Sequence, residues 1–409
     1  MGIQYPATKL DPQPIAKSAF PNGVVRALPS IGDIARSDWD RLFPGRAEGW
    51  DYFNAWEQAR PEGFSSSALG LFAGDMLVAA APLFRSNYNL DIPASRALKP
   101  IGHWINRCFP KLLNMPILGM GSPLTEECPL GFLPGIREAE RQAAFSALMS
   151  GMSAHARSNG TSILTLKDVT DRDDEWLRKP MADAGFVRVP TLPIATLHLP
   201  HKSEQDYLAS LSSSMRSDIR KKMRALQHVL VSFIEDARMA DDEIVALFQE
   251  TKAKRKVDYA EMDEVPDAYF REILGGLGGR AKIMIMRVEG EIACFSLFLE
   301  EKNRIIGKYV GMRYPRAREY NLYFLNWMLI VRRCIENGIE WLQAGQTTYQ
   351  QKMRLGCKFK RSWVYFKHEG TVRGPLFRAF GPLMSFDSLD PDLRALGDNA
   401  PYWPTGQAA

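Results

Sequence analysis

Residues 304–344 read RIIGKYVGMRYPRAREYNLYFLNWMLIVRRCIENGIEWLQA and contain three secondary-structure patterns in succession. The mostly apolar run 304–311 predicts a strand, and the longer apolar segment 321–337 predicts a helix. An Asn-Gly pair, a typical helix stop, ends the helix pattern. The next run, 339–344, predicts a second strand. A strand, a helix and another strand in this order indicate an α/β unit.

A similar series of elements occurs in the first half of the chain. In the second half, a predicted hairpin over 281–299 precedes the strand, helix and strand just described. The first half has a hairpin pattern over 68–84, a helix over 138–158 and a strand over 162–166. The separation between the two series is far too long for a solenoid. We therefore predict a duplicated α/β unit, with two unrelated α/β domains as the alternative.

The length of the chain agrees with two domains. At about 100–200 residues per domain, 409 residues predict an N-terminal domain over 24–200 and a C-terminal domain over 201–369. Residues 370–409 contain several Pro and Gly and are expected to form a tail that packs on the body or frays. The net charge of +5 comes from 52 basic and 47 acidic residues that are mixed along the chain. This balance does not by itself indicate a nucleic-acid-binding protein, and it is compatible with a phosphate-bearing small molecule.

Several classes of protein find no support in the sequence. The five cysteines include no CxxC pair, which argues against a disulfide framework or zinc site and favours a reducing, cytoplasmic compartment. No secretory signal is present at the N-terminus, and the longest apolar run, 76–84, is shorter than the roughly 20 residues that span a bilayer, so no membrane insertion is expected. His198 and His201 do not have metal-binding spacing, and no metal is expected.

Several segments of the second half match a known family. They are Gly290–Ala293, Ile306–Gly311, the helix 322–337, the segment GQTTYQQKMRLG at 345–356 and the basic helix around 216–222. Over roughly residues 200–368 the chain resembles the CelD-type branch of GNAT acyltransferases, relatives of the Fem-type aminoacyl transferases. The resemblance implies tandem GNAT-like halves, each with a mixed, mostly antiparallel sheet flanked by helices. It also implies acyl transfer from acyl-CoA or a similar thioester to an amine.

One departure from the family concerns the phosphate loop. The common GNAT pattern is Gln/Arg-x-x-Gly-x-Gly/Ala, whereas residues 312–320 read MRYPRAREY and lack glycine. Three arginines instead precede the start of a helix, where unpaired N–H groups favour phosphate. We expect the donor to be bound by residues of this strand and loop: Tyr309, Gly311, Arg313, Arg316 and Arg318. A solvated basic loop is the alternative.

The basic helix is a candidate acceptor site. Arg216, Arg220 and Arg224 are four residues apart and share one face. They border an apolar stripe that begins at Ile219, so they are expected to line a cleft for an anionic substrate. An ordinary amphipathic helix with arginine stems lying over the core is the alternative.

Polar residues at 346–352 are candidate catalytic groups. They follow the strand 339–344, and ligands of open α/β sheets gather at the carboxyl ends of strands. Tyr349 could protonate the leaving thiolate, and Lys352 could bind an anion or stabilise the oxyanion, with Gln346 beside them and Thr348 contacting substrate. The alternative is a capping loop with a solvated lysine.

No general base is evident in the sequence. Its candidates are Asp258, Glu261 and Asp263, for which a solvated loop of mixed charge is the favoured interpretation. A water relay could take the proton instead.

Three functional hypotheses follow. The first is an N-acyltransferase that acts on a small-molecule amine. The second is a Fem-like transferase that uses aminoacyl-tRNA in cell-wall or polysaccharide biosynthesis; the sequence has no long heptad segment of the kind that forms a Fem-type helical arm. The third is a non-catalytic module that binds an anionic polymer through the clusters at Arg216 and Lys252, which should weaken steeply with salt.

Overall fold

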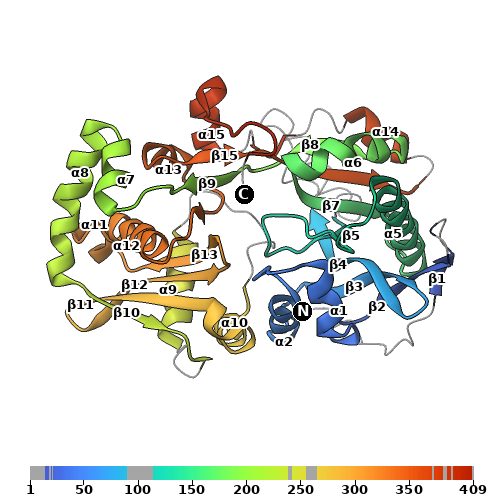
Figure 1. Ribbon diagram of the computed structural model, residues 1–409, viewed down its shortest axis with the longest axis horizontal. Helices are drawn as coiled ribbons and strands as arrows, with labels where there is room; N and C mark the ends of the chain where they lie inside the picture. The colour runs from blue at the N-terminus through green and yellow to red at the C-terminus, as the bar shows by residue number, and fades with distance from the viewer. Residues whose placement is uncertain are drawn as a thin grey trace. The chain divides into compact units, whose positions relative to one another are not determined.

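The computed structural model describes residues 14–17, 20, 22–89, 114–237, 242–254, 265–370, 373–380, 385–387 and 390–407. The chain divides into two compact units (Figure 1). The first unit comprises Met1–Leu192, Tyr259–Pro266 and Arg361–Leu389, and the second comprises Pro193–Asp258, Asp267–Lys360 and Asp390–Ala409. The candidate general bases Asp258, Glu261 and Asp263 lie outside the described residues.

The first unit is built on a sheet with the order β1-β2-β3-β4-β5-β7-β16-β8, and β6 pairs with β4. The strands are β1 (Pro14–Lys17), β2 (Gly23–Leu28), β3 (Phe64–Ala73), β4 (Met76–Asn89), β5 (Asn114–Met120), β6 (Gly131–Phe132), β7 (Ile163–Thr170), β8 (Val187–Pro190) and β16 (Ser362–His368). Its helices include α1 (Arg36–Leu42), α2 (Trp50–Gln58), α5 (Glu138–Ser158), α6 (Asp171–Asp183) and α14 (Arg373–Phe380).

The second unit is built on a sheet with the order β10-β11-β12-β13-β14-β9-β15. The strands are β9 (Ile194–His198), β10 (Leu230–Ile234), β11 (Ala281–Val288), β12 (Glu291–Glu300), β13 (Arg304–Met312), β14 (Trp341–Gln343) and β15 (Lys358–Lys360). Its helices include α7 (Glu204–Ser210), α8 (Ser213–Met223), α9 (Asp242–Ala253), α10 (Tyr269–Leu277), α11 (Arg316–Glu319), α12 (Leu322–Glu336), α13 (Tyr349–Arg354) and α15 (Pro391–Leu396).

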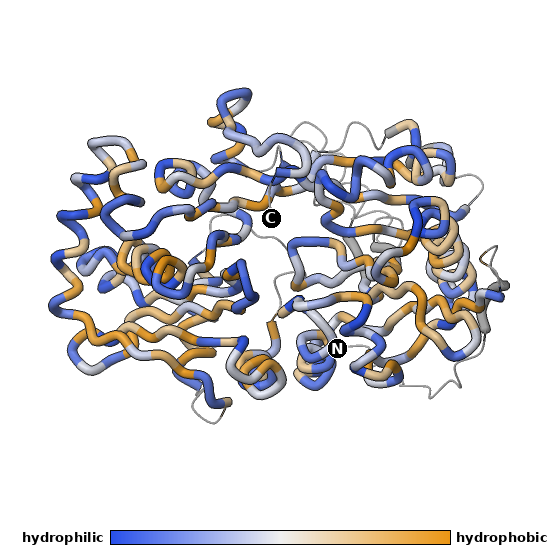
Figure 2. Tube along the Cα trace, in the orientation of Figure 1, coloured by the Kyte–Doolittle hydropathy of each residue, from blue (hydrophilic) through white to orange (hydrophobic). Residues whose placement is uncertain are grey.

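The predicted fold class is confirmed. In the described part of each unit, helices flank a mixed sheet whose pairs are antiparallel except for one, which is β5–β7 in the first unit and β13–β14 in the second. Apolar residues follow the strands β11 and β12 in Figure 2, and every residue of β12 between its two ends is buried. None of the described helices is long and apolar enough to cross a bilayer.

The same local signal ends the long helix of each unit. Gly160 follows α5 with φ +63°, and Gly338 follows α12 with φ +64°. In both cases the next residue donates its backbone N–H to the carbonyl five residues earlier, at 2.9 Å after α5 and 2.8 Å after α12. Glycine adopts this left-handed conformation at little cost, which is why Asn-Gly predicted both helix ends.

The two sheets exchange one strand each. β9 follows β8 in the chain but lies in the second sheet between β14 and β15, and β16 follows β15 but lies in the first sheet between β7 and β8. The expected domains 24–200 and 201–369 instead keep β9 and β16 with their sequence neighbours. The difference arises because strand pairing over more than a hundred residues leaves no trace in local periodicity.

Part of the expected tail, 370–409, completes the second sheet. Phe359 of β15 donates its N–H to the Pro401 carbonyl (2.7 Å) and accepts the Trp403 N–H (2.9 Å). The Trp403 indole also donates to Thr196 Oγ1 of β9 at 2.7 Å. These bonds cover the outer edge of β15, which would otherwise expose unpaired backbone groups.

Candidate active site

The parallel strands β13 and β14 pair over a short distance only. Their register covers three residue pairs, from Arg304–Trp341 to Ile306–Gln343. β13 continues to Met312, where it is still paired with β12 on its other side. The two strands therefore separate at their carboxyl ends, which is where ligands of open α/β sheets bind.

Buried polar contacts fix the point of separation. The Arg304 guanidinium donates to Gln343 Oε1 at 2.9 Å and to Glu301 Oε2 at 3.0 Å, and the Gln343 side chain is buried. A Cβ atom on Gly307 would lie 3.4 Å from the Gln343 carbonyl oxygen, at ordinary van der Waals distance, so the two strands are still closely packed here. Because a buried charge is costly unless it is paired, these contacts strongly favour the observed arrangement.

The loop after β14 has an unusual backbone. Gly345, Thr347 and Thr348 have φ values of +82°, +72° and +54°. A positive φ is uncommon for residues other than glycine and is a true outlier for β-branched threonine. Such conformations persist where the surrounding contacts over-determine them, and they cluster at functional sites.

Tyr349 and Lys352 anchor this loop from α13. Tyr349 is fully buried and donates its hydroxyl to the Pro193 carbonyl at 2.7 Å. Lys352 is buried and its Nζ donates to the carbonyls of Gly345 and Gln346, at 3.1 Å each. Both polar atoms thus make internal contacts, which supports structural roles rather than the predicted roles of acid and oxyanion ligand. The alternative interpretation, a capping loop with a solvated lysine, does not fit either, because Lys352 is buried.

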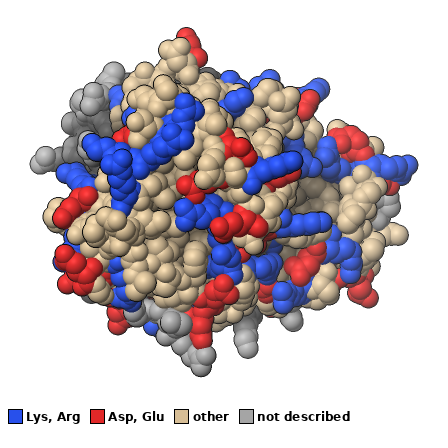
Figure 3. Space-filling view, turned by 60° about the vertical axis from the view of Figure 1, so that its left-hand side comes forward, with Lys and Arg blue, Asp and Glu red and all other residues tan. Residues whose placement is uncertain are grey.

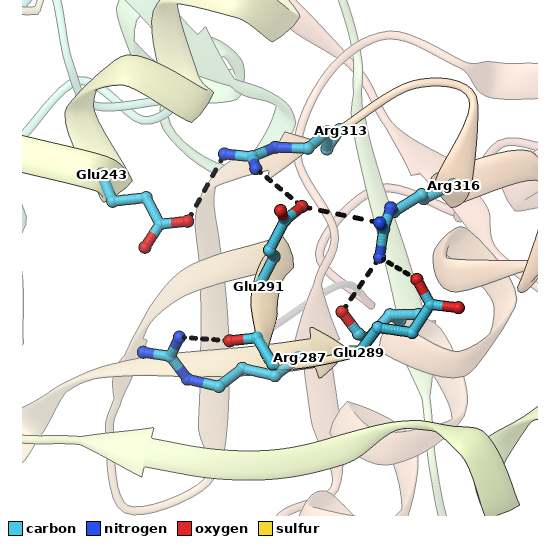
Figure 4. A network of polar contacts seen from close by, with 8 residues as sticks. Glu243, Arg287, Glu289, Glu291, Arg313 and Arg316 are labelled. Carbon is cyan, nitrogen blue, oxygen red and sulfur yellow. Dashed lines mark hydrogen bonds and ion pairs between the residues drawn. The ribbon is translucent and has the colours of Figure 1, made fainter.

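Two of the three predicted donor-binding arginines are paired with carboxylates (Figure 4). Arg313 contacts Glu243 of α9 at 3.4 Å and Glu291 at 3.3 Å. Arg316 contacts Glu289 at 2.9 Å and Glu291 at 3.7 Å, and it donates to the Val288 carbonyl at 3.1 Å. These arginines tie the β13–α11 loop to the β11–β12 turn. A phosphate would have to compete with three carboxylates for them.

The third arginine, Arg318, lines a surface hollow of about 570 Å³ together with Thr251, Lys254, Tyr314 and Pro315. The Tyr314 ring has Lys254 Nζ at 5.2 Å and the Arg318 guanidinium carbon at 5.6 Å from its centroid, within the range of cation–π attraction. Lys254 also contacts Glu250 at 2.5 Å. Lys254 belongs to the basic cluster at Lys252, which in the sequence pointed only to an anionic polymer.

Beyond the β13–β14 ladder, Tyr309 and Gly311 contribute backbone rather than exposed side chains to β13. The Tyr309 ring packs against Phe248 and Tyr269, with centroids 5.2 and 5.5 Å apart. A Cβ atom on Gly311 would lie only 2.2 Å from the ring of Phe295, so the ring occupies the space that a side chain at 311 would need. Any donor contact of these two residues would therefore involve their main chain.

The predicted acceptor arginines lie on the surface of the second unit. Arg216 on α8 is half-buried and donates to the Ala209 carbonyl at 3.1 Å, and Arg220 is exposed. Arg224 is also exposed and belongs to a short 3-10 helix that follows α8. Figure 3 shows Lys and Arg side chains interspersed with Asp and Glu. The face that it shows is therefore not uniformly basic.

The corresponding position in the first unit is filled by the chain itself. The β5–β7 register ends at Met120–Leu166, and β7 continues to Thr170. The loop 121–128 then packs beside β7, where Cys128 donates its N–H to the Asp168 carbonyl at 2.8 Å. Lys167 Nζ donates to the carbonyl of the buried Thr125 at 3.0 Å. Burial raises the pKa of Asp168, opposed by the neighbouring Lys167 ammonium.

No group of three or more His, Cys, Asp or Glu side chains that could hold a metal ion occurs among the described residues.

Comparisons with known proteins agree with this geometry. Residues 213–353 match the family model described as acetyltransferase (GNAT) domain. No curated protein matches the chain. A solved structure of FemX has a TM-score of 0.54 at 10% identity, covering 80% of this chain and 92% of that one. A tandem GNAT protein from the clavulanic acid biosynthesis pathway has a TM-score of 0.50 at 15% identity, covering 85% and 99%. The chain thus has the tandem fold of the GNAT superfamily and its Fem-type relatives, with a GNAT domain matched within its second unit.

Proposed function

We propose that the chain transfers an acyl group from a thioester, such as acyl-CoA, to an amine at the carboxyl ends of β13 and β14. The observation that supports this most directly is the β13–β14 ladder, which ends at Ile306–Gln343 while β13 continues to Met312. An extended donor could lie along β13, where main-chain groups would hold it. Positioning an amine against a polarised carbonyl lowers the barrier through proximity and through stabilisation of developing charge.

The reaction requires little covalent chemistry from the protein. The amine nitrogen attacks the thioester carbonyl carbon, a C–N bond forms, and the C–S bond breaks. The ammonium proton leaves through water, and the thiolate takes a proton from solvent. No buried acid is needed, which agrees with the internal hydrogen bonds of Tyr349 and Lys352. Gln346 and Thr348 remain candidates for contact with the reacting groups.

The phosphate-bearing end of the donor would bind in the hollow at Lys254 and Arg318. Arg318 and Lys254 line this hollow, with Lys254 also paired with Glu250 at 2.5 Å, whereas Arg313 and Arg316 are held by Glu243, Glu289 and Glu291. Guanidinium groups bind phosphate oxygens through paired N–H donors, and lysine adds a point charge. In this proposal Arg313 and Arg316 shape the loop and Arg318 contacts the donor.

The acceptor would be a small amine that also carries an anionic group. Arg216, Arg220 and Arg224 are the arginines of α8 and the turn after it, and Arg220 and Arg224 are exposed to solvent. An acceptor anion could exchange water for these side chains at modest cost. Removal of Arg220 and Arg224 together should raise the acceptor KM and leave the donor KM unchanged.

A second candidate is a Fem-like transferase that takes its acyl group from aminoacyl-tRNA. It is favoured by the similarity to FemX, 92% of whose length is covered. Transfer that is abolished by ribonuclease would identify this donor, whereas transfer from acyl-CoA that survives ribonuclease would exclude it for the measured reaction.

The test is a thiol-release assay with a panel of acyl-CoA donors and amines. Arg318→Ala should raise the donor KM by roughly tenfold, because a charged contact to phosphate contributes about 1.5–3 kcal/mol. Lys254→Ala should raise it by less, because Glu250 already pairs with the Lys254 ammonium. Arg313→Ala is the matched control and should raise it by less than about threefold, because its guanidinium faces carboxylates. A larger effect of Arg313→Ala than of Arg318→Ala would reverse the assignment, and no thiol release with any donor would refute the proposed activity.

A further inference from the structure

The strand β10 forms one edge of the second sheet. Its only strand partner among the described residues is β11, with a register that runs from Leu230–Arg287 to Ile234–Ile283. Figure 1 shows β10 as the outermost strand of this sheet. In an antiparallel ladder, alternate residues direct their backbone N–H and C=O groups toward the partner strand, and the residues between them direct theirs away from it. The outer edge of β10 therefore presents backbone donors and acceptors.

This edge lacks the features that usually prevent pairing with another strand. Residues 229–234 read VLVSFI and contain no charge, proline or glycine. Two of their apolar side chains are exposed: Leu230 keeps 68% of its surface and Phe233 keeps 42%. Among the described residues, Met76 of the first unit is the only other exposed large hydrophobic side chain, at 47%. An uncharged edge strand with exposed apolar side chains is a template for β-strand addition.

The sequence of the strand fits an antiparallel copy of itself. With a two-fold axis at Ser232, Leu230 of one copy would lie opposite Ile234 of the other, and Val231 would lie opposite Phe233. Because side chains alternate between the two faces of a sheet, each of these apolar pairs would share one face. Cross-strand pairs of this kind stabilise a sheet directly.

The charges at the two ends of the strand are also complementary. Arg224 and His228 precede it and are exposed, whereas Glu235 and Asp236 follow it. Glu235 pairs with Lys282 of β11 and still keeps 52% of its side chain exposed. Antiparallel pairing would bring the basic end of each copy beside the acidic end of the other, with His228 opposite Asp236. Parallel pairing would instead place like charges side by side, so the charges select the antiparallel orientation.

We propose that β10 is the interface of a two-fold symmetric dimer, in which the edge strands of two copies of this chain pair antiparallel about Ser232. The second sheets of the two copies then form one continuous sheet. Such an interface uses the same surface on both copies and closes after two of them. A contact built on one short strand is smaller than a standard interface, so we expect a dissociation constant roughly in the micromolar range. This inference goes beyond the proposed function and would stand if the chain had another activity.

The first experiment is sedimentation equilibrium of the full chain at concentrations from well below to well above the micromolar range. Wild type should pass from monomer to dimer. Leu230→Lys should raise the dissociation constant by roughly 10²-fold, because each of the two copies loses an apolar contact. Met76→Lys is the matched control, since it places the same charge at an exposed apolar position of the first unit, and it should dimerise as wild type does.

A second experiment tests the register. Paired residues of antiparallel strands have Cα atoms about 4.5–5.5 Å apart, which a disulfide can bridge. Mild oxidation of Ser232→Cys should therefore give a covalent dimer, and mass spectrometry of its peptides should find the two chains joined at position 232. Met76→Cys should give no such dimer under the same conditions. This measurement also replaces the first one if Leu230→Lys does not fold.

Three results would overturn the proposal. One is a wild-type chain that stays monomeric at every concentration. Another is a dimer that Leu230→Lys does not weaken and that does not cross-link at position 232, because its contact then lies elsewhere. The third comes from amide hydrogen exchange: if residues 230–234 are protected equally at all concentrations in a monomer, the chain's own residues cover the edge. Protection that increases with the fraction of dimer would support the proposed interface.

Discussion

Replacing Tyr207 by phenylalanine should destabilise the second unit through two lost hydrogen bonds. The Tyr207 side chain is fully buried; its hydroxyl donates to the Leu355 carbonyl at 2.8 Å and accepts the Trp327 indole N–H at 2.9 Å. The hydroxyl therefore connects α7, α12 and the end of α13. The substitution removes one oxygen and leaves a buried donor and a buried acceptor without their partner.

The magnitude follows from those two orphaned groups. A buried donor or acceptor that loses its partner costs about 1–3 kcal/mol, so the pair should cost roughly 3 kcal/mol when partial relaxation is allowed. For a unit of this size, about 1 kcal/mol shifts the melting temperature by roughly 2–4 °C, so a decrease of roughly 6–12 °C is expected. Urea unfolding monitored by tryptophan fluorescence measures the free energy, and calorimetry measures the melting temperature.

The control is Tyr320→Phe, at a half-buried tyrosine of the same unit, which should change stability by less than about 0.5 kcal/mol. The double variant Tyr207→Phe/Trp327→Phe should cost less than the sum of its single variants, because the bond between the two side chains is removed only once. If Tyr207→Phe unfolds at the same urea concentration as wild type, the two hydrogen bonds do not stabilise the unit and the reasoning is wrong.

Three further predictions concern the thiols, the donor stoichiometry and the C-terminal segment. Burial raises the pKa of the Cys357 thiol from an ordinary value of 9.0 to about 12. Its contribution to stability is therefore present below pH 9 and is lost as the pH rises toward 12, by roughly 1.4 kcal/mol at pH 10. The urea midpoint of wild type should therefore fall between pH 8 and 10 by more than that of Cys357→Ala. Native mass spectrometry should show one acyl-CoA per chain, because the loop 121–128 fills the corresponding position of the first unit; a second bound donor that persists in a chain with Arg318→Ala would contradict this. Deleting residues 390–409 should destabilise the second unit, because Trp403 then no longer bonds to Phe359 and Thr196, and an unchanged melting temperature would show that this segment is dispensable.

The sequence predicted those features of the fold that depend on neighbouring residues. Both Asn-Gly pairs end helices because a glycine with positive φ terminates a helix wherever it occurs. The turn between β11 and β12 likewise follows from Glu289 and Gly290, which have φ values of +52° and +86°. The exchange of β9 and β16 was not predictable in this way, because both strands pair with segments far away in the sequence.

The same distinction explains why the contacts of the predicted site residues could not be read from the sequence. The arginines of the β13–α11 loop were expected to be available for phosphate because the loop itself carries little opposing charge. Their partners Glu243, Glu289 and Glu291 are 22 to 70 residues away in sequence and meet them only in the folded sheet. Tyr349 and Lys352 were likewise predicted to be catalytic because the sequence shows no partner for them. Their hydrogen-bond partners are backbone carbonyls, and no sequence pattern identifies which carbonyl a side chain will meet.

The two units show that the pairing of β-strands alone does not make a site. Both contain a parallel pair whose second strand is preceded by a long helix ending in Asn-Gly, and in both the ladder of that pair is short. In the first unit, β7 extends past the ladder and accepts the loop 121–128, which satisfies its backbone groups with the chain's own. In the second unit, β13 extends past the ladder, and the loop that follows β14 has a strained backbone. Lys352 donates a hydrogen bond to the Gly345 carbonyl of this loop. Asp168 of the first unit also has a positive φ, +59°, but the loop 121–128 occupies the place beside it. The strained loop of the second unit is therefore the better indicator of where a substrate is expected.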